Sequence, residues 1–154
     1  MTRLSSAFGK KYSADAIRTK TFELAGHVFK VRVPLTKEME EIQQRINKID
    51  EVDAKARFEK MTTTFKDSTA VEGIVVTKDD VIIEGRSTRE LVESIMQMEN
   101  RTVEYIRLLI PENGTLEDIT YKEIEEEWPF QVQLEILNKI TEAIQPGYKD
   151  SRKN

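Results

Sequence analysis

Residues 21–49, TFELAGHVFKVRVPLTKEMEEIQQRINKI, predict a β-hairpin that leads into a long amphipathic helix. Apolar and charged residues alternate over residues 22–24 and 28–33, which is the period of half-buried strands. Ala25-Gly26 between the two runs predicts the turn, because glycine tolerates a positive φ. Pro34 ends the second strand, because proline has no N–H to donate to a sheet.

The residues after Pro34 predict a helix from Lys37 to about Phe65. Thr36 is a candidate cap, and Glu38 falls in the first turn, where the helix dipole favours a negative charge. Threonines 62–64 are expected to end the helix, because their hydroxyls compete for backbone hydrogen bonds. The apolar residues of the first half are spaced to share one face: Met39, Ile42, Ile46 and Ile49.

The hairpin sequence FELAGHVFKVRVP (residues 22–34), followed by an acidic helix, resembles the start of the tail assembly chaperones of long-tailed bacteriophages. Those proteins commonly open with a short strand pair, a glycine turn and a proline. The resemblance covers the first third of the chain and continues only as a pattern of helices. It implies a protein of the host cytoplasm, absent from the mature virion, that binds the tape-measure protein and helps recruit tail-tube subunits. The alternative is a structural tail or neck component retained in the virion.

Length and composition favour one globular domain over residues 19–147, with a flexible basic arm at 1–18 and a flexible tail at 148–154. The chain has 154 residues, of which 38% are hydrophobic and 34% charged, so it is too apolar for wholesale disorder. The absence of cysteine excludes disulfides and thiol nucleophiles. No apolar run approaches the length of a membrane span, so we expect no membrane partner.

Charge is distributed unevenly along the chain. Residues 1–37 hold eight basic and two acidic side chains, whereas the remaining residues hold sixteen and twenty-six. One interpretation is a solvated basic arm with solvated helix faces. The other is weak self-association, in which the basic arm of one copy contacts the acidic segment 112–127 of the next. Overall acidity argues against nucleic acid as a partner.

The second half predicts a further hairpin over residues 74–84 and three helices. The first helix follows a capping box at residues 87–90 and runs to Ile110, with Leu91, Ile95 and Met98 on its apolar stripe. A short acidic helix is expected from Thr115, and a last one from Pro129 to Gln145. The inward residues predicted for the last helix are Phe130, Leu134, Leu137, Ile140 and Ile144. The fold class is therefore α+β, mainly helical, with two short hairpins and about four helices.

No set of residues predicts catalysis. His27 is the only histidine, which excludes a histidine-based triad or a multi-histidine metal site. No phosphate-binding glycine motif occurs, so we expect no enzyme activity, cofactor or metal. The candidate partner-binding residues are Met96 and Met98, since methionine suits adaptable surfaces, and the aromatic pair Trp128 and Phe130. Core packing is the alternative role for all four.

Overall fold

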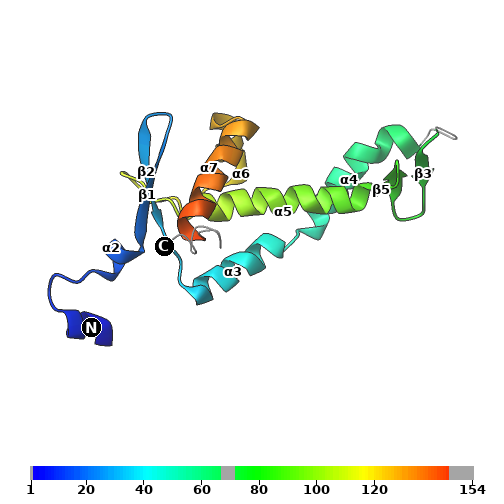
Figure 1. Cartoon of the computed structure of the whole chain (residues 1–154). Coiled ribbons are helices and arrows are strands. Elements are labelled where there is room, and N and C mark those ends of the chain that lie inside the picture. The colour runs from blue at the N-terminus through cyan, green and yellow to red at the C-terminus, as the bar shows by residue number, and fades with distance from the viewer. Residues whose placement is uncertain (1, 67–71, 146–154) are drawn as a thin grey trace, which may run out of the picture. The chain divides into compact units, whose positions relative to one another are not determined.

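The fold is α+β and mainly helical, as the sequence predicted (Figure 1). The computed structural model describes residues 2–66 and 72–145, and the expected tail at 148–154 lies outside these ranges. Within them there are seven helices rather than about four, with five short strands. The helices are α1 (Arg3–Phe8), α2 (Ala14–Arg18), α3 (Thr36–Asn47), α4 (Glu51–Lys66), α5 (Thr88–Ile106), α6 (Tyr121–Glu127) and α7 (Phe130–Ile144). The strands are β1 (Thr19–Leu24), β2 (His27–Arg32), β3 (Ile74–Val76), β4 (Val81–Ile83) and β5 (Arg86–Ser87).

The chain forms two compact units. Unit 1 comprises residues 1–42 and 102–154, and unit 2 comprises residues 43–101. The single domain expected over residues 19–147 stays a prediction. Among the described residues, no helix combines the length and the apolar character needed to cross a membrane.

The first predicted hairpin is confirmed in unit 1, where β1 pairs with β2 in antiparallel fashion, with Phe22 opposite Phe29. Its turn residues Ala25 and Gly26 both have positive φ, at 52° and 80°. Positive φ values at both central residues are typical of a type I′ turn, whose twist matches that of the two strands it connects. The alanine at the first position is the unusual one, because its Cβ disfavours this conformation.

The other edge of β2 is paired by residues that the sequence assigned to a helix. The helix expected to reach Ile110 ends at Ile106, so that part of the prediction is wrong. Arg32 N–H donates to the Leu108 carbonyl at 2.9 Å, and Ile110 N–H donates to the Lys30 carbonyl at 2.8 Å. Two causes favour this ending: Pro111 disfavours the helical conformation at the residue before it, and the edge of β2 has backbone groups to satisfy.

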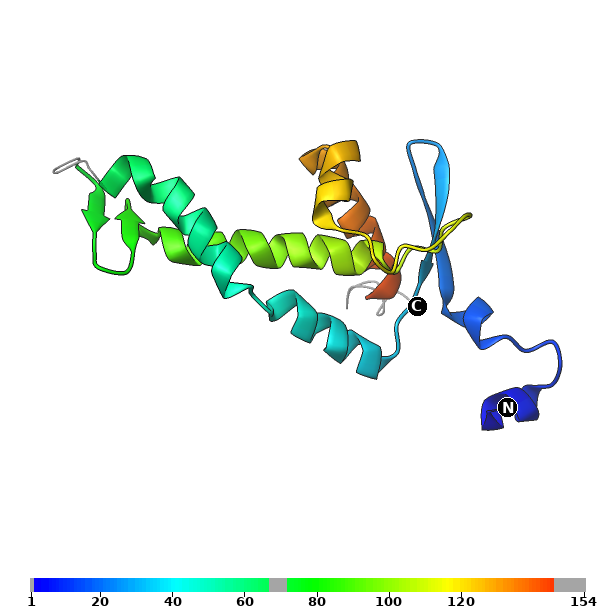
Figure 2. The same cartoon turned by 180° about the vertical axis from the view of Figure 1, so that it is seen from behind.

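Helix α7 lies beside the hairpin and contacts both strands, as Figure 2 shows from behind. Its expected span is confirmed within one residue at each end, but its inward face is rotated from the prediction. Phe130 and Leu134 are exposed, whereas Gln133 and Ile136 are buried with Leu137, Ile140 and Ile144. The core of unit 1 also includes Val31, Ile106, Leu108 and Ile124.

An ion cluster fastens the start of α3 to the hairpin. The Glu38 carboxylate accepts from Arg18 at 2.7 Å and from Arg32 at 2.6 Å. The hydrogen bond from Arg32, opposed by burial and reinforced by Arg18, holds the pKa of Glu38 below its ordinary value. The helix begins at Thr36 itself, so the cap position falls one residue earlier than expected, and Leu35 provides the first carbonyl acceptor.

The substitution Glu38→Gln is expected to lower the free energy of unfolding at neutral pH by at most about 1 kcal/mol, because the cluster is partly solvated. A lowered folded-state pKa means that the stabilisation is present above the unfolded pKa and is lost as the pH falls through the folded one. The difference in free energy of unfolding between wild type and variant should therefore shrink as the pH falls below 4.5, the ordinary pKa of a glutamate. Urea denaturation at neutral and acidic pH measures it, and a difference independent of pH would contradict the role of the Glu38 charge.

In unit 2, the single helix predicted from Lys37 to Phe65 is interrupted at residues 48–50, so the prediction of one helix is wrong. Asp50 accepts hydrogen bonds from Val52 N–H at 3.0 Å and Asp53 N–H at 3.2 Å, which caps the start of α4. The Asn100 amide donates to the carbonyls of Ile46 and Lys48, both at 3.1 Å. The free backbone groups on both sides of the interruption therefore have hydrogen-bond partners: Asp50 for the N–H groups, and Asn100, which is distant in sequence, for the carbonyls.

The threonines expected to end the helix do not end it. Thr62 donates its hydroxyl to the Phe58 carbonyl at 2.7 Å, and Thr63 donates to Glu59 at 2.5 Å. A hydroxyl that bonds to the carbonyl four residues earlier fits inside a helix. Thr62 is fully buried, so its hydroxyl needs this internal partner.

The second hairpin is confirmed, and β5 adds a third strand to it. Only one half of the predicted capping box is observed: the Ser87 hydroxyl accepts from Glu90 N–H at 3.2 Å and donates to Asp80. Asp80 also accepts from Arg89 N–H at 3.1 Å. Burial acts to raise the pKa of Asp80, but the hydrogen bonds from Ser87, Arg89 and Val81 hold it below its ordinary value.

Candidate functional site

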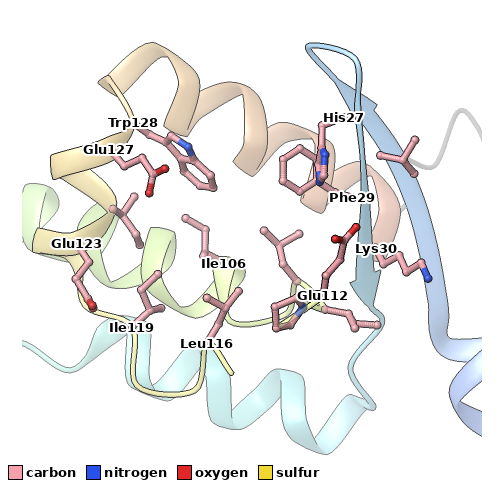
Figure 3. Close-up of a pocket in the computed structure, with 15 residues that line it drawn as sticks. His27, Phe29, Lys30, Ile106, Glu112, Leu116, Ile119, Glu123, Glu127 and Trp128 are labelled. Carbon is pink, nitrogen blue, oxygen red and sulfur yellow. The ribbon is translucent and has the colours of Figure 1, made fainter. Parts of the chain in front are cut away.

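An apolar pocket in unit 1 is the candidate functional site. It has a volume of about 470 Å³, which lies within the range of ligand-binding pockets. One wall is β2 at residues 27–30, and the opposite wall is α6 with Trp128 (Figure 3). The floor is the end of α5 and the connection at residues 109–119.

Apolar side chains dominate the interior of the pocket. Figure 3 shows the rings of Phe29 and Trp128 at opposite sides of the cavity, with Ile106, Leu116 and Ile119 below them in this view. Phe29 is held by two ring contacts, stacked on Phe22 at 5.2 Å and edge-on to His27 at 4.5 Å between centroids. A rigid aromatic wall of this kind offers contact area at small cost in side-chain entropy.

Carboxylates surround the apolar interior. Glu112, Glu123 and Glu127 line the pocket, against a single lysine, Lys30. We call these three glutamates the acidic rim. Glu123 is also part of a capping box with Thr120, because its carboxylate accepts from Thr120 N–H at 2.8 Å. This capping box was missed from the sequence, which placed the start of the acidic helix at Thr115; α6 begins at Tyr121.

A buried glutamine positions Trp128. Gln133 is only 3% exposed and donates to the Trp128 carbonyl at 2.9 Å. Its amide oxygen accepts from the Tyr121 hydroxyl at 3.1 Å. The corner between α6 and α7 is therefore fixed from both helices, and with it the backbone of Trp128. A glutamine within the apolar run of the last helix was the available signal in the sequence.

An arginine holds the floor of the pocket. Arg107 donates to the Glu104 carboxylate at 3.2 Å and to the Ile119 carbonyl at 3.4 Å. Its Nε is buried with no hydrogen-bond partner among the described residues. Arg107 thus ties residues 109–119 to the end of α5, at the cost of one unsatisfied donor.

The predicted partner-binding residues are not gathered in one place. Trp128 lines the pocket, whereas Phe130 is 51% exposed and does not line it. Met96 and Met98 belong to unit 2, where Met96 is buried and Met98 half-buried. The sequence also missed Phe29, Leu116 and Ile119 as pocket residues, because they come from segments with no helical spacing in common with Trp128.

The pocket offers binding chemistry. Among the described residues, no group of three or more histidine, cysteine or acidic side chains could hold a metal ion. His27 is exposed, and its ring contacts the ring of Phe29. An apolar interior with a mainly acidic rim suits an apolar side chain flanked by basic residues.

Comparisons of the chain with protein-family models, with curated proteins and with solved structures found no match.

Proposed function

We propose that this protein is a binding module that covers apolar segments of a partner chain while a larger assembly is built. The observation that carries the proposal is the pocket, with its apolar interior and its acidic rim. Such a site favours a segment with an apolar anchor next to lysine or arginine. Contacts of this size are individually modest, which suits a cover that must later be released.

We further propose that the assembly is a bacteriophage tail and that the protein is a tail assembly chaperone. The hairpin FELAGHVFKVRVP supports this proposal, because it carries the resemblance and its residues 27–30 form one wall of the pocket. The partners are then the tape-measure protein, whose long helices need cover, and the tail-tube protein, which replaces that cover. The chaperone acts in the host cytoplasm and is absent from the mature virion.

Co-expression with a tape-measure candidate, sought among the genes next to the one that encodes this protein, tests the proposal. We expect the candidate to be recovered in the soluble fraction with this chain and to aggregate without it. Purified virions should lack the protein. Equal solubility of the candidate in its absence would overturn the chaperone role.

The second candidate function is a structural tail or neck component. The exposed apolar side chains on unit 1, among them Phe130 and Leu134, favour it because they would suit a permanent interface. A stoichiometric amount of the protein in purified virions would establish this function in place of the first.

A further inference from the structure

The basic arm carries an apolar face that stays exposed among the residues that the structure describes. Leu4 and Phe8 lie four residues apart, on one side of α1, and are 58% and 67% exposed. None of the residues of α1 is buried. Lys10 and Lys11 follow directly, and Tyr12 contacts Phe8 with ring centroids 5.5 Å apart. The arm therefore presents an apolar anchor next to two positive charges.

The pocket has the complementary character. Its interior is apolar and its rim carries three carboxylates. The segment 112–127 around it holds seven acidic side chains and one lysine. Complementary charge steers two surfaces together and sets their orientation. An apolar anchor with adjacent lysines is the kind of ligand that this pocket suits, and the arm has this character.

We propose that the arm of a second copy, residues 3–12, docks in this pocket, with Leu4 and Phe8 inside and Lys10 and Lys11 against the acidic rim. The inference rests on the proposed function only in taking the pocket as the binding site. The second copy is the occupant because no residue of the arm lines the pocket of its own copy. Arg18 also tethers the base of the arm, by donating to the Val33 carbonyl at 3.0 Å.

The contact is heterologous, because the arm and the pocket are different surfaces. Repetition of such a contact produces open chains, or rings where the rotation closes. The arm then competes with the partner segment for the same pocket. Self-association thereby regulates the site, since it covers the pocket until a partner displaces the arm.

Sedimentation velocity of the full chain is the first test. We expect the sedimentation coefficient to rise with protein concentration at low salt and to rise less at high salt, because salt screens the lysine–glutamate contacts. The double variants Leu4→Ser/Phe8→Ser and Glu112→Lys/Glu127→Lys should both remain monomeric at low salt. Matched controls at exposed positions, Val52→Ser and Glu40→Lys/Glu41→Lys, should associate as the wild type does.

Mixing the two double variants tests the head-to-tail geometry. Each variant keeps the one surface that the other lacks, so the mixture should form one-to-one dimers that do not grow. A synthetic peptide of residues 1–18 should change the fluorescence of Trp128, the single tryptophan of the chain, when it is titrated into the arm variant.

The inference would be overturned by a strict monomer at high concentration, by association that persists in both double variants, or by a mixture that forms no dimer. If the wild type is a monomer and its Trp128 fluorescence differs from that of the Leu4→Ser/Phe8→Ser variant at every protein concentration, the arm docks in the pocket of its own copy instead. A monomer that still keeps the tape-measure candidate soluble would remove this inference and leave the proposed function standing. Self-association of a protein that has no effect on the solubility of that candidate would support this inference and remove the proposed function.

Discussion

The substitution Ile140→Asp is expected to lower the free energy of unfolding by about 3 kcal/mol or more. Ile140 is fully buried on α7, in the helix that contacts both strands of the first hairpin. An aspartate there would place a carboxylate in the buried core of unit 1, where it loses its hydration. Urea denaturation followed by circular dichroism measures the loss, and failure to recover folded protein is the extreme form of the same result.

Leu134→Asp is the matched control for this substitution. Leu134 lies on the same helix and is 40% exposed, so an aspartate there remains solvated. We expect its effect to stay within about 1 kcal/mol. The sequence alone predicted that Leu134 and Ile140 both face inward. If both substitutions lower the free energy of unfolding equally, Leu134 is buried as the sequence predicted, and its observed exposure is wrong.

The substitution Leu116→Glu is expected to weaken partner binding at least about tenfold, equivalent to about 1.4 kcal/mol. Leu116 is half-buried in the floor of the pocket, where Figure 3 places it between the two walls. A carboxylate at this position would lose part of its hydration whenever an apolar anchor entered. Co-expression with the tape-measure candidate should then yield less soluble partner, while the variant itself remains folded.

Asn113→Glu separates occlusion of the pocket from a change of charge. Asn113 is exposed in the same connection and does not line the cavity. The variant adds the same negative charge close to the acidic rim, so binding of a basic partner should be unchanged or stronger. If both glutamates weaken binding equally, charge alone explains the effect and the apolar pocket is not the binding site.

The two hairpins and the last helix could be predicted from the sequence because their signals are local. Alternation of apolar and charged residues predicted the strands of the first hairpin, and Ala25-Gly26 predicted its turn. Continuous β-branched runs predicted the strands of the second hairpin. Pro129 and the apolar run after it set α7 within one residue at each end. In each case neighbouring residues alone carry the preference, so no distant contact was needed.

Helix ends and inward faces depended on tertiary contacts instead. Asn100 satisfies the carbonyls at the end of α3, and the edge of β2 takes up residues 108–110 that helical spacing assigned to α5. The stripe predicted on α5 is likewise displaced, since Leu91 is exposed and Val92 and Met96 are buried. Successive side chains of a helix point about 100° apart around its axis, so a shift of one residue turns the buried face by that angle. Which face is buried depends on the element that the helix packs against, and that element is distant in sequence.

The candidate site shows the same division. Sequence alone determined a cysteine-free, acidic chain with a basic arm, an opening hairpin and an aromatic pair at Trp128 and Phe130. Only the tertiary structure decided that Trp128 faces Phe29 across a pocket while Phe130 lies exposed. The physical reason is that a pocket is made by side chains from separate segments, here β2, the end of α5, residues 109–119 and α6. Their meeting depends on packing contacts such as those of Gln133 and Arg107, which no local pattern encodes.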